Sequence, residues 1–212
     1  YVDLRRVQEL VDVPNSPNGL CMLPGGVLAI TCGGEVHNGR ETVISFVAAR
    51  NDSDPQALAA YQASSLAARR FEWPMGLALT NDGLLACSMR DASTALYKFA
   101  LDGSMDELAT VPVLANYGQG FTRCAVHQQT QRTYAIINDE DLGRNALVIL
   151  DANLQYVVTV ETTDYMWSHY GHCGVPIRDV AVHGDQVIIL TGNGHAKGSG
   201  LRLLDLDGRF LR

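Results

Sequence analysis

Two histidines and a cysteine lie within five residues of one another in the segment DYMWSHYGHC, residues 164–173. His169, His172 and Cys173 offer imidazole nitrogens and a thiol, the ligand types that suit zinc or copper. Adjacent residues at 172 and 173 cannot easily share a tetrahedral site with His169, and a remote fourth ligand would be needed. A metal site on this segment is therefore one of two interpretations.

The second interpretation of this segment is a loop that contacts a protein partner. It carries three aromatic side chains, Tyr165, Trp167 and Tyr170. Trp and Tyr dominate the binding energy of protein interfaces. The sequence leaves both interpretations open.

An acidic run, Asn138-Asp139-Glu140-Asp141, is a third candidate, because carboxylates suit calcium. It lacks the alternating ligand spacing of an EF-hand loop, so a solvated acidic loop is favoured. The chain contains no Gly-x-Ser-x-Gly elbow, P-loop or Gly-x-Gly-x-x-Gly motif. No catalytic residue is predicted.

Four segments follow one plan: a short apolar run, a polar or glycine turn and a second apolar run. They are Gly19–Gly34, Gly76–Asp91, Arg123–Asp141 and Arg178–Asn193. A third strand-like run follows each, and a fourth follows in two of them, at Glu107–Val113 and Gln155–Val160. The unit recurs about every 50 residues, which is typical of a β-propeller blade.

The sequence therefore predicts an all-β fold, a β-propeller built of four-stranded antiparallel blades with one helical insertion. We expect a blade end at 1–13 and blades at about 14–72, 73–116, 117–163 and 174–212. The stretch Val2–Val13 resembles Leu204–Arg212, so the chain starts and stops at nearly the same phase of the repeat. Four blades of a larger ring and a closed four-bladed ring both fit, and we favour the larger ring.

The helical insertion is expected at residues 53–70. Ser53 or Asp54 can cap it, and Pro55 suits the first helical position. Three side chains fall on one face at helical spacing: Leu58, Tyr61 and Leu66. This face either packs on its own blade or docks a partner.

The repeat units resemble the NHL repeat and its relatives in the gluconolactonase and strictosidine-synthase group. Those families show Pro-x-Gly, then an Asp-Gly turn, then Asp-x-Asp-Gly. Pro17–Gly19 and Pro74–Gly76 carry the first element, Asp82–Gly83 the second and Asp205–Gly208 the third, with Asp151–Asn153 as a weaker copy. The resemblance implies a propeller, typically of six blades. An Asp that is usual late in the second strand is absent, which marks a divergent member.

The resemblance also implies a place for a metal. Gluconolactonase-like enzymes hold one divalent cation at the mouth of the central channel with a Glu, two Asn and an Asp. Asn18 matches one of these Asn positions, and Asp179 is the acidic residue that could serve beside it. Met75, at the equivalent position of the next blade, cannot ligate a hard cation. No cofactor is expected from the sequence, and at this place calcium is left open.

The composition argues against several classes of protein. With 16 Lys and Arg against 23 Asp and Glu, the net charge is −7, which disfavours nucleic acid. No apolar run approaches the roughly 18 residues of a membrane span. Four of the five cysteines lie in or beside apolar runs and are expected in the core. Asn51-Asp-Ser53 is a glycosylation acceptor pattern that matters only if the protein is secreted.

Taken together, the sequence favours a non-catalytic propeller scaffold that binds protein partners, within a larger chain or assembly. The alternative is a metal-dependent lactonase or related hydrolase. A divalent cation held by Asn18 on the central axis would distinguish the two. The compartment is not fixed by the sequence.

Overall fold

Four antiparallel sheets make up the fold in a computed structural model of the chain. The structure describes residues 17–32, 43–49, 53–69, 74–89, 95–114, 120–139, 144–161, 177–192 and 200–211. Blade 1 contains β1 (Pro17–Leu23), β2 (Val27–Cys32) and β3 (Val43–Ala48), with the 3-10 turn η2 (Pro24–Gly26) between the first two. Blade 2 contains β4 (Pro74–Leu79), β5 (Gly83–Ser88), β6 (Ala95–Ala100) and β7 (Glu107–Pro112).

The second half of the chain repeats this arrangement. Blade 3 contains β8 (Phe121–Val126), β9 (Thr133–Asp139), β10 (Arg144–Leu150) and β11 (Tyr156–Glu161). Blade 4 contains β12 (Ile177–His183), β13 (Gln186–Thr191) and β14 (Gly200–Asp205), after which Phe210 pairs back onto Leu204. Within each blade the strands are neighbours in chain order, as the repeat predicts.

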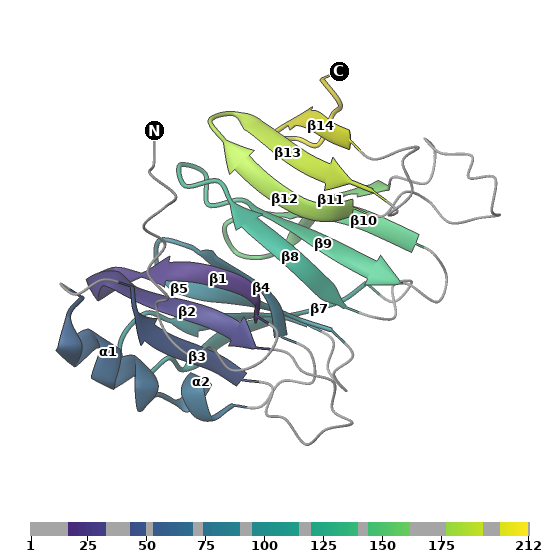
Figure 1. The fold of residues 1–212 in the computed structure, drawn as a ribbon. Coiled ribbons are helices and arrows are strands. Elements are labelled where there is room, and N and C mark those ends of the chain that lie inside the picture. The colour runs from purple at the N-terminus through teal and green to yellow at the C-terminus, as the bar shows by residue number, and fades with distance from the viewer. Residues whose placement is uncertain are drawn as a thin grey trace.

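The blades stack in chain order (Figure 1). The first strand of each blade packs on the first strand of the next, so that β1 contacts β4, β4 contacts β8 and β8 contacts β12. Three apolar clusters fill the three junctions. The predicted all-β propeller fold of antiparallel blades is confirmed. Among the described residues, no helix is long and apolar enough to cross a membrane.

Each blade has two faces, because side chains alternate across a strand. We call the face toward the preceding blade the leading face and the face toward the following blade the trailing face. The trailing face of blade 2 includes Leu85 and Leu96, which pack against Ala135 and Val148 on the leading face of blade 3. Every junction in the chain joins one trailing face to one leading face.

The innermost strands approach one another closely near their first residues. All four carry a register shift there, at Pro17/Gly19, Pro74/Leu77, Phe121/Arg123 and Ile177/Asp179. A Cβ on Gly19 would lie 2.4 Å from the Met75 carbonyl oxygen, and one on Gly76 would lie 2.8 Å from the Arg123 Cα. Glycine at these two positions is therefore required by the backbone of the next blade.

An aspartate opens the turn after the third strand in three blades. The Asp151 Oδ1 accepts from the amides of Asn153 and Gln155 at 2.8 and 2.9 Å, and Asp205 Oδ1 accepts from Asp207 and Arg209 at 2.9 Å each. Asp102 Oδ1 likewise accepts from the Ser104 amide at 3.3 Å. The Asp-x-Asp-Gly element of the sequence is thus an Asx turn.

Three residues after each of these aspartates the backbone is left-handed. The φ angles are 50° at Met105, 61° at Leu154 and 83° at Gly208. Met105 lies in the cluster between blades 1 and 2, and Leu154 lies in the cluster between blades 2 and 3. In these two turns the residue three positions after the aspartate therefore enters the junction with the preceding blade, and its burial offsets the cost of a left-handed φ in a non-glycine residue.

The insertion after β3 forms two short helices, α1 (Pro55–Gln62) and α2 (Ser65–Ala68), instead of one. The Asp54 side chain accepts from the Gln56 amide at 2.8 Å, which confirms the predicted cap. Ser64 caps the second helix by accepting from the Ala67 amide. Both helices pack against β3 at the edge of blade 1 (Figure 1).

Candidate functional site

Asn18 and Asp179, the two residues implied as cation ligands, lie on the innermost strands of the first and last blades. The Asn18 amide Nδ2 donates to the Pro74 carbonyl oxygen at 3.3 Å and so ties blade 1 to blade 2. The Asp179 carboxylate accepts from the Val180 amide at 2.9 Å. Blades 2 and 3 stand between them in the stacking order. Within the described ranges, no group of three or more His, Cys, Asp or Glu side chains is placed to hold a metal ion.

Several of the sequence-predicted residues fall outside the part of the chain that the structure describes. They are Asn51, Glu140, Asp141, Tyr165, Trp167, His169, Tyr170, His172 and Cys173. The metal and interface interpretations of residues 164–173 therefore remain predictions, as does the glycosylation of Asn51.

The apolar helix face does not point to solvent. Tyr61 and Leu66 are 4% and 0% exposed, and Leu58 packs against the same cluster between blades 1 and 2. The Tyr61 ring stacks on Phe46, with 5.7 Å between ring centroids. Of the two interpretations of this face, the structure shows packing on its own blade, because the apolar surface of β3 lies beside both helices. The expectation that these three side chains contact a partner is corrected.

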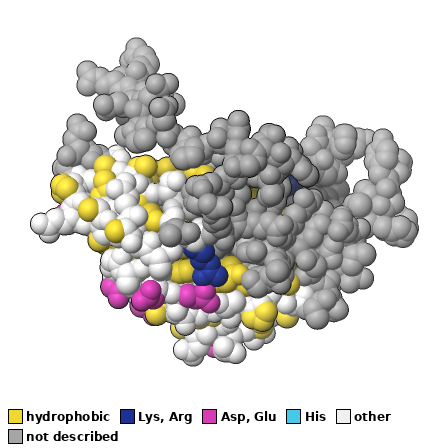
Figure 2. All heavy atoms as spheres, turned by 90° about the horizontal axis from the view of Figure 1, so that it is seen from below, with side chains coloured by type: hydrophobic (Ala, Val, Ile, Leu, Met, Phe, Trp, Pro, Cys, Tyr) yellow, Lys and Arg dark blue, Asp and Glu magenta, His cyan; other side chains and the backbone are white. Residues whose placement is uncertain are grey.

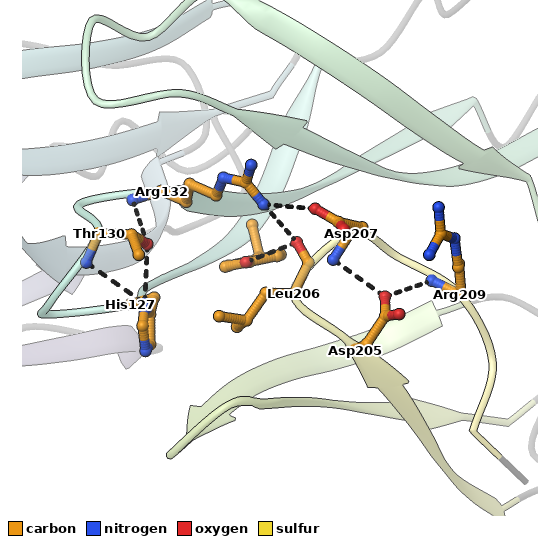
Figure 3. A network of polar contacts seen from close by, with 8 residues as sticks. His127, Thr130, Arg132, Asp205, Leu206, Asp207 and Arg209 are labelled. Atoms are coloured by element: carbon orange, nitrogen blue, oxygen red, sulfur yellow. Dashed lines mark hydrogen bonds and ion pairs between the residues drawn. The ribbon is translucent and has the colours of Figure 1, made fainter.

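A set of polar contacts fastens blade 3 to blade 4 (Figure 3). Arg132 Nη1 forms an ion pair with Asp207 Oδ1 at 2.7 Å and donates to the Leu206 carbonyl oxygen at 3.1 Å. The Tyr134 hydroxyl donates to the same carbonyl at 2.9 Å. The hydrogen bond and charge of Arg132 lower the pKa of Asp207. We call these four residues the polar clamp.

The turn that carries Arg132 is itself held by side chains. His127 Nδ1 lies 2.7 Å from Thr130 Oγ1 and also accepts from the Thr130 amide at 3.4 Å. On the other side of the same turn, the Asn81 amide donates to Gln131 Oε1 at 2.8 Å, which reaches blade 2. Polar groups at this end of blade 3 therefore serve to join blades on both sides.

The described cysteines are free and mostly buried. A hydrogen bond with Cys87, followed by burial, raises the pKa of the Cys124 thiol well above its usual value. Burial raises the pKa of Cys21 to about 11. These thiols are therefore protonated at neutral pH and poor nucleophiles. The expectation of core cysteines is confirmed for Cys32, Cys87 and Cys124.

The leading face of blade 1 is open along its first strand, β1. Leu20 is 69% exposed, whereas the residues at the same position of blades 2, 3 and 4, namely Leu77, Cys124 and Val180, are 8%, 9% and 7% exposed. Met22, two residues along the same strand, is also exposed. Those three counterparts are buried because a preceding blade covers them.

The trailing face of blade 4 is open in the same way. Leu201 is 71% exposed, but Leu96 and Leu147, which take its position in blades 2 and 3, are both 0% exposed. Leu190 pairs with Leu201 across β13 and β14 and is exposed too. The two open faces lie at opposite ends of the stack of blades (Figure 1).

Sequence reasoning did not single out these faces, because the pattern of an uncovered blade is the same as that of a covered one. Only the missing neighbour distinguishes them, and that is a property of the assembled fold. Other exposed apolar side chains of the described residues include Leu108 on β7 and Val157 on β11. On the face seen in Figure 2, hydrophobic side chains are dispersed among polar ones, and acidic side chains gather near a basic group.

The chain resembles solved structures at the level of the fold. It superposes on the hydrazine synthase of Kuenenia stuttgartiensis with a TM-score of 0.61 and 16% identity, over 100% of this chain and 51% of that one. It also superposes on the computationally designed Ika4 protein with a TM-score of 0.52 and 10% identity, over 93% of this chain and 98% of that one. The chain thus spans about half the length of the first of these.

Comparison by sequence gives no further assignment. No family model matches the chain. No curated protein matches it either. The blades, their junctions and the structural likeness define a β-propeller, and identities this low show the fold alone.

Proposed function

We propose that this chain is a non-catalytic propeller scaffold that binds protein through the open faces of its terminal blades. One observation carries the proposal: Leu20 and Leu201 are exposed at positions where every covered blade buries an apolar side chain. Apolar surface of this kind is a feature of sites that bind other proteins. Burying this apolar surface on a partner would be favourable for the same reason that burying apolar surface at the internal junctions is favourable.

The polar side chains of the described residues support the same proposal. The side chains of Asn18, Arg132 and Tyr134 donate hydrogen bonds to main-chain carbonyl oxygens of neighbouring blades. Lys98 forms an ion pair with Asp82 at 2.8 Å, within blade 2. Fixing blades in this way gives a rigid frame, which presents a binding surface with little loss of conformational entropy.

Kinship with the NHL and gluconolactonase-like group forms part of the proposal. It is supported by the repeated Asx turns at Asp151 and Asp205 and by the close approach at Gly19 and Gly76. A propeller can carry this kinship without the lactonase chemistry, because function belongs to sites and not to folds.

The test compares capture of partner proteins from the source organism by four forms of the chain: wild type, Leu20→Lys, Leu201→Lys and Leu108→Lys. Leu108 is exposed on β7, away from both open faces, and its variant is the matched control. We expect a partner that is retained by wild type and by Leu108→Lys and lost from at least one face variant. Capture that is equal for all four forms would contradict the proposal.

A second measurement addresses the lactonase alternative. The chain is incubated with a δ-lactone and calcium, and hydrolysis is followed by acid release. We expect the rate of the buffer alone. Hydrolysis above that rate that disappears in Asn18→Ala would overturn the scaffold proposal.

A further inference from the structure

We infer that the open trailing face of blade 4 binds the open leading face of blade 1 of a second copy of this chain. Two copies joined in this way at both ends would form a single closed ring. The inference rests on the proposed function, since it names the partner of the open faces.

The first step is the constancy of the junctions inside the chain. Three times, a trailing face of aliphatic and aromatic residues packs on the leading face of the next blade. The proposed junction continues this established interface and adds no new kind of contact. It would cover Leu201 as blade 3 is covered at Leu147, and Leu20 as blade 2 is covered at Leu77.

The second step is the match between the two open surfaces. The leading face of blade 1 exposes Leu20 and Met22 on β1; of their cross-strand partners, Leu28 is half-buried and Ile30 is already buried. On the trailing face of blade 4, Leu190 pairs with Leu201 and Ile188 pairs with Leu203. Both surfaces are uncharged and aliphatic at these positions, which favours burying one on the other. The nearest charged side chain on the trailing face is Asp179, which pairs with Leu190 at the inner strand and accepts from the Val180 amide.

The third step concerns the residue that takes the position of Thr31. Across the junction of blades 1 and 2, the Thr31 hydroxyl donates to the Met75 carbonyl oxygen at 2.6 Å. In blade 4 this position is taken by Leu190, because Thr31 pairs with Gly19 and Leu190 pairs with Asp179 directly after the register shift of each innermost strand. The proposed junction therefore has an aliphatic contact at this place.

The fourth step is symmetry. The four described blades leave one leading and one trailing face open, and these faces differ. Contacts between unlike surfaces produce a ring when the rotation closes and a filament when it does not. Two copies related by a two-fold axis satisfy both faces of both chains, so the pair leaves no open blade.

The experiment is sedimentation of the purified chain at about 1 to 100 μM, a range that resolves a dimer with a Kd near 1 μM, or about −8 kcal/mol. We expect a species of twice the 23.0 kDa chain mass. The leading-face variant Leu20→Lys/Met22→Lys and the trailing-face variant Leu190→Lys/Leu201→Lys should each weaken the dimer at least about tenfold, and Leu108→Lys should not. Circular dichroism verifies that each variant is folded.

A mixture of the two face variants tests the direction of the contact. A mixed pair contains one junction in which both faces are intact, so dimers should reappear at concentrations where neither variant forms them alone. If only one variant loses the dimer, like faces pair with like, and the inference is wrong. A wild-type chain that stays monomeric at the highest concentration also overturns it, while the capture experiment above still decides the proposed function.

Discussion

The junction between blades 1 and 2 and the junction between blades 3 and 4 join equivalent faces but are fastened by different means. The first is covered by α1 and α2, whose Tyr61 and Leu66 enter its apolar cluster. The second is fastened by the polar clamp, in which Arg132 and Tyr134 share the Leu206 carbonyl. The repeat therefore determines which faces meet, and segments that differ between blades determine how firmly each junction is held.

Arginine takes part in both junctions, in different surroundings. The Arg69 guanidinium lies 4.4 Å from the centroid of the Tyr97 ring and forms an ion pair with Glu107. Arg132 pairs with Asp207, a side chain that is 58% exposed. A cation over an aromatic ring gains energy from the ring as well as from the carboxylate. We therefore expect the helix-covered junction to lose more stability than the clamped one when its fastening is removed.

The largest expected effect is that of Leu66→Ala. Leu66 lies on α2 and is fully buried, so the substitution leaves a cavity and should lower the free energy of unfolding by about 2 to 5 kcal/mol. Denaturant unfolding measures it. Leu108→Ala, at an exposed position, serves as the control and should change stability by less than about 0.5 kcal/mol. Equal effects of the two variants would mean that the helices do not belong to the core.

Much of this fold follows from the sequence, because its information is local and repeated. Apolar runs at a regular interval indicate the blades, and the cap at Asp54 is recognisable from one residue and the proline after it. The break of the insertion at Ala63 is less visible: Ser64 caps a second helix that sequence spacing does not separate from the first. That the apolar helix face packs on its own blade was one of the two interpretations of the sequence, and β3, the strand just before the insertion, is the surface it covers.

The candidate site was less predictable than the fold. Asn18 was chosen through a family pattern, and the structure gives its amide a partner in the next blade. The open faces depend on which blades have neighbours, and Arg132 finds Leu206 more than 70 residues away. A contact between residues so far apart in the chain leaves no recognisable pattern in a single sequence.

The next effect in size is that of Tyr134→Phe, which removes the hydrogen bond to Leu206 but keeps the buried ring. The carbonyl retains its bond from Arg132, so we expect a loss of about 1 kcal/mol in unfolding free energy. Tyr156→Phe is the matched variant, since its hydroxyl donates to the Pro112 carbonyl at 2.8 Å between blades 3 and 2. A loss that is much larger for Tyr156→Phe would show that the polar clamp is not the main fastening of blade 3.

The smallest expected effect is a dependence of stability on acid. Burial tends to raise the pKa of Glu107, but hydrogen bonds from Arg69 and Thr110 outweigh it and lower the pKa below its usual 4.5. A lowered pKa in the fold means that Glu107 stabilises the protein above pH 4.5, and that this contribution is lost as the pH falls through the lowered value.

Unfolding midpoints between pH 7 and pH 3 measure this acid dependence. Because Glu107 is more than one third exposed, solvent screening keeps the effect small. Glu107→Gln should flatten the decline at low pH, and so should Asp207→Asn, whose pKa is lowered by Arg132. An unchanged profile in both variants would show that neither ion pair contributes to its junction.

The close approach of the innermost strands gives the stack its curvature. Gly19 lets the backbones of blades 1 and 2 nearly touch on the inside, and Gly76 does so for blades 2 and 3. Larger side chains separate the blades farther out, such as Phe46 and Phe99 between blades 1 and 2. Each blade is therefore a wedge, and a row of wedges bends toward closure. A side chain at either glycine would widen the narrow end and straighten the row. A straight row never meets its own beginning, and unlike end faces would then add copy after copy into a filament.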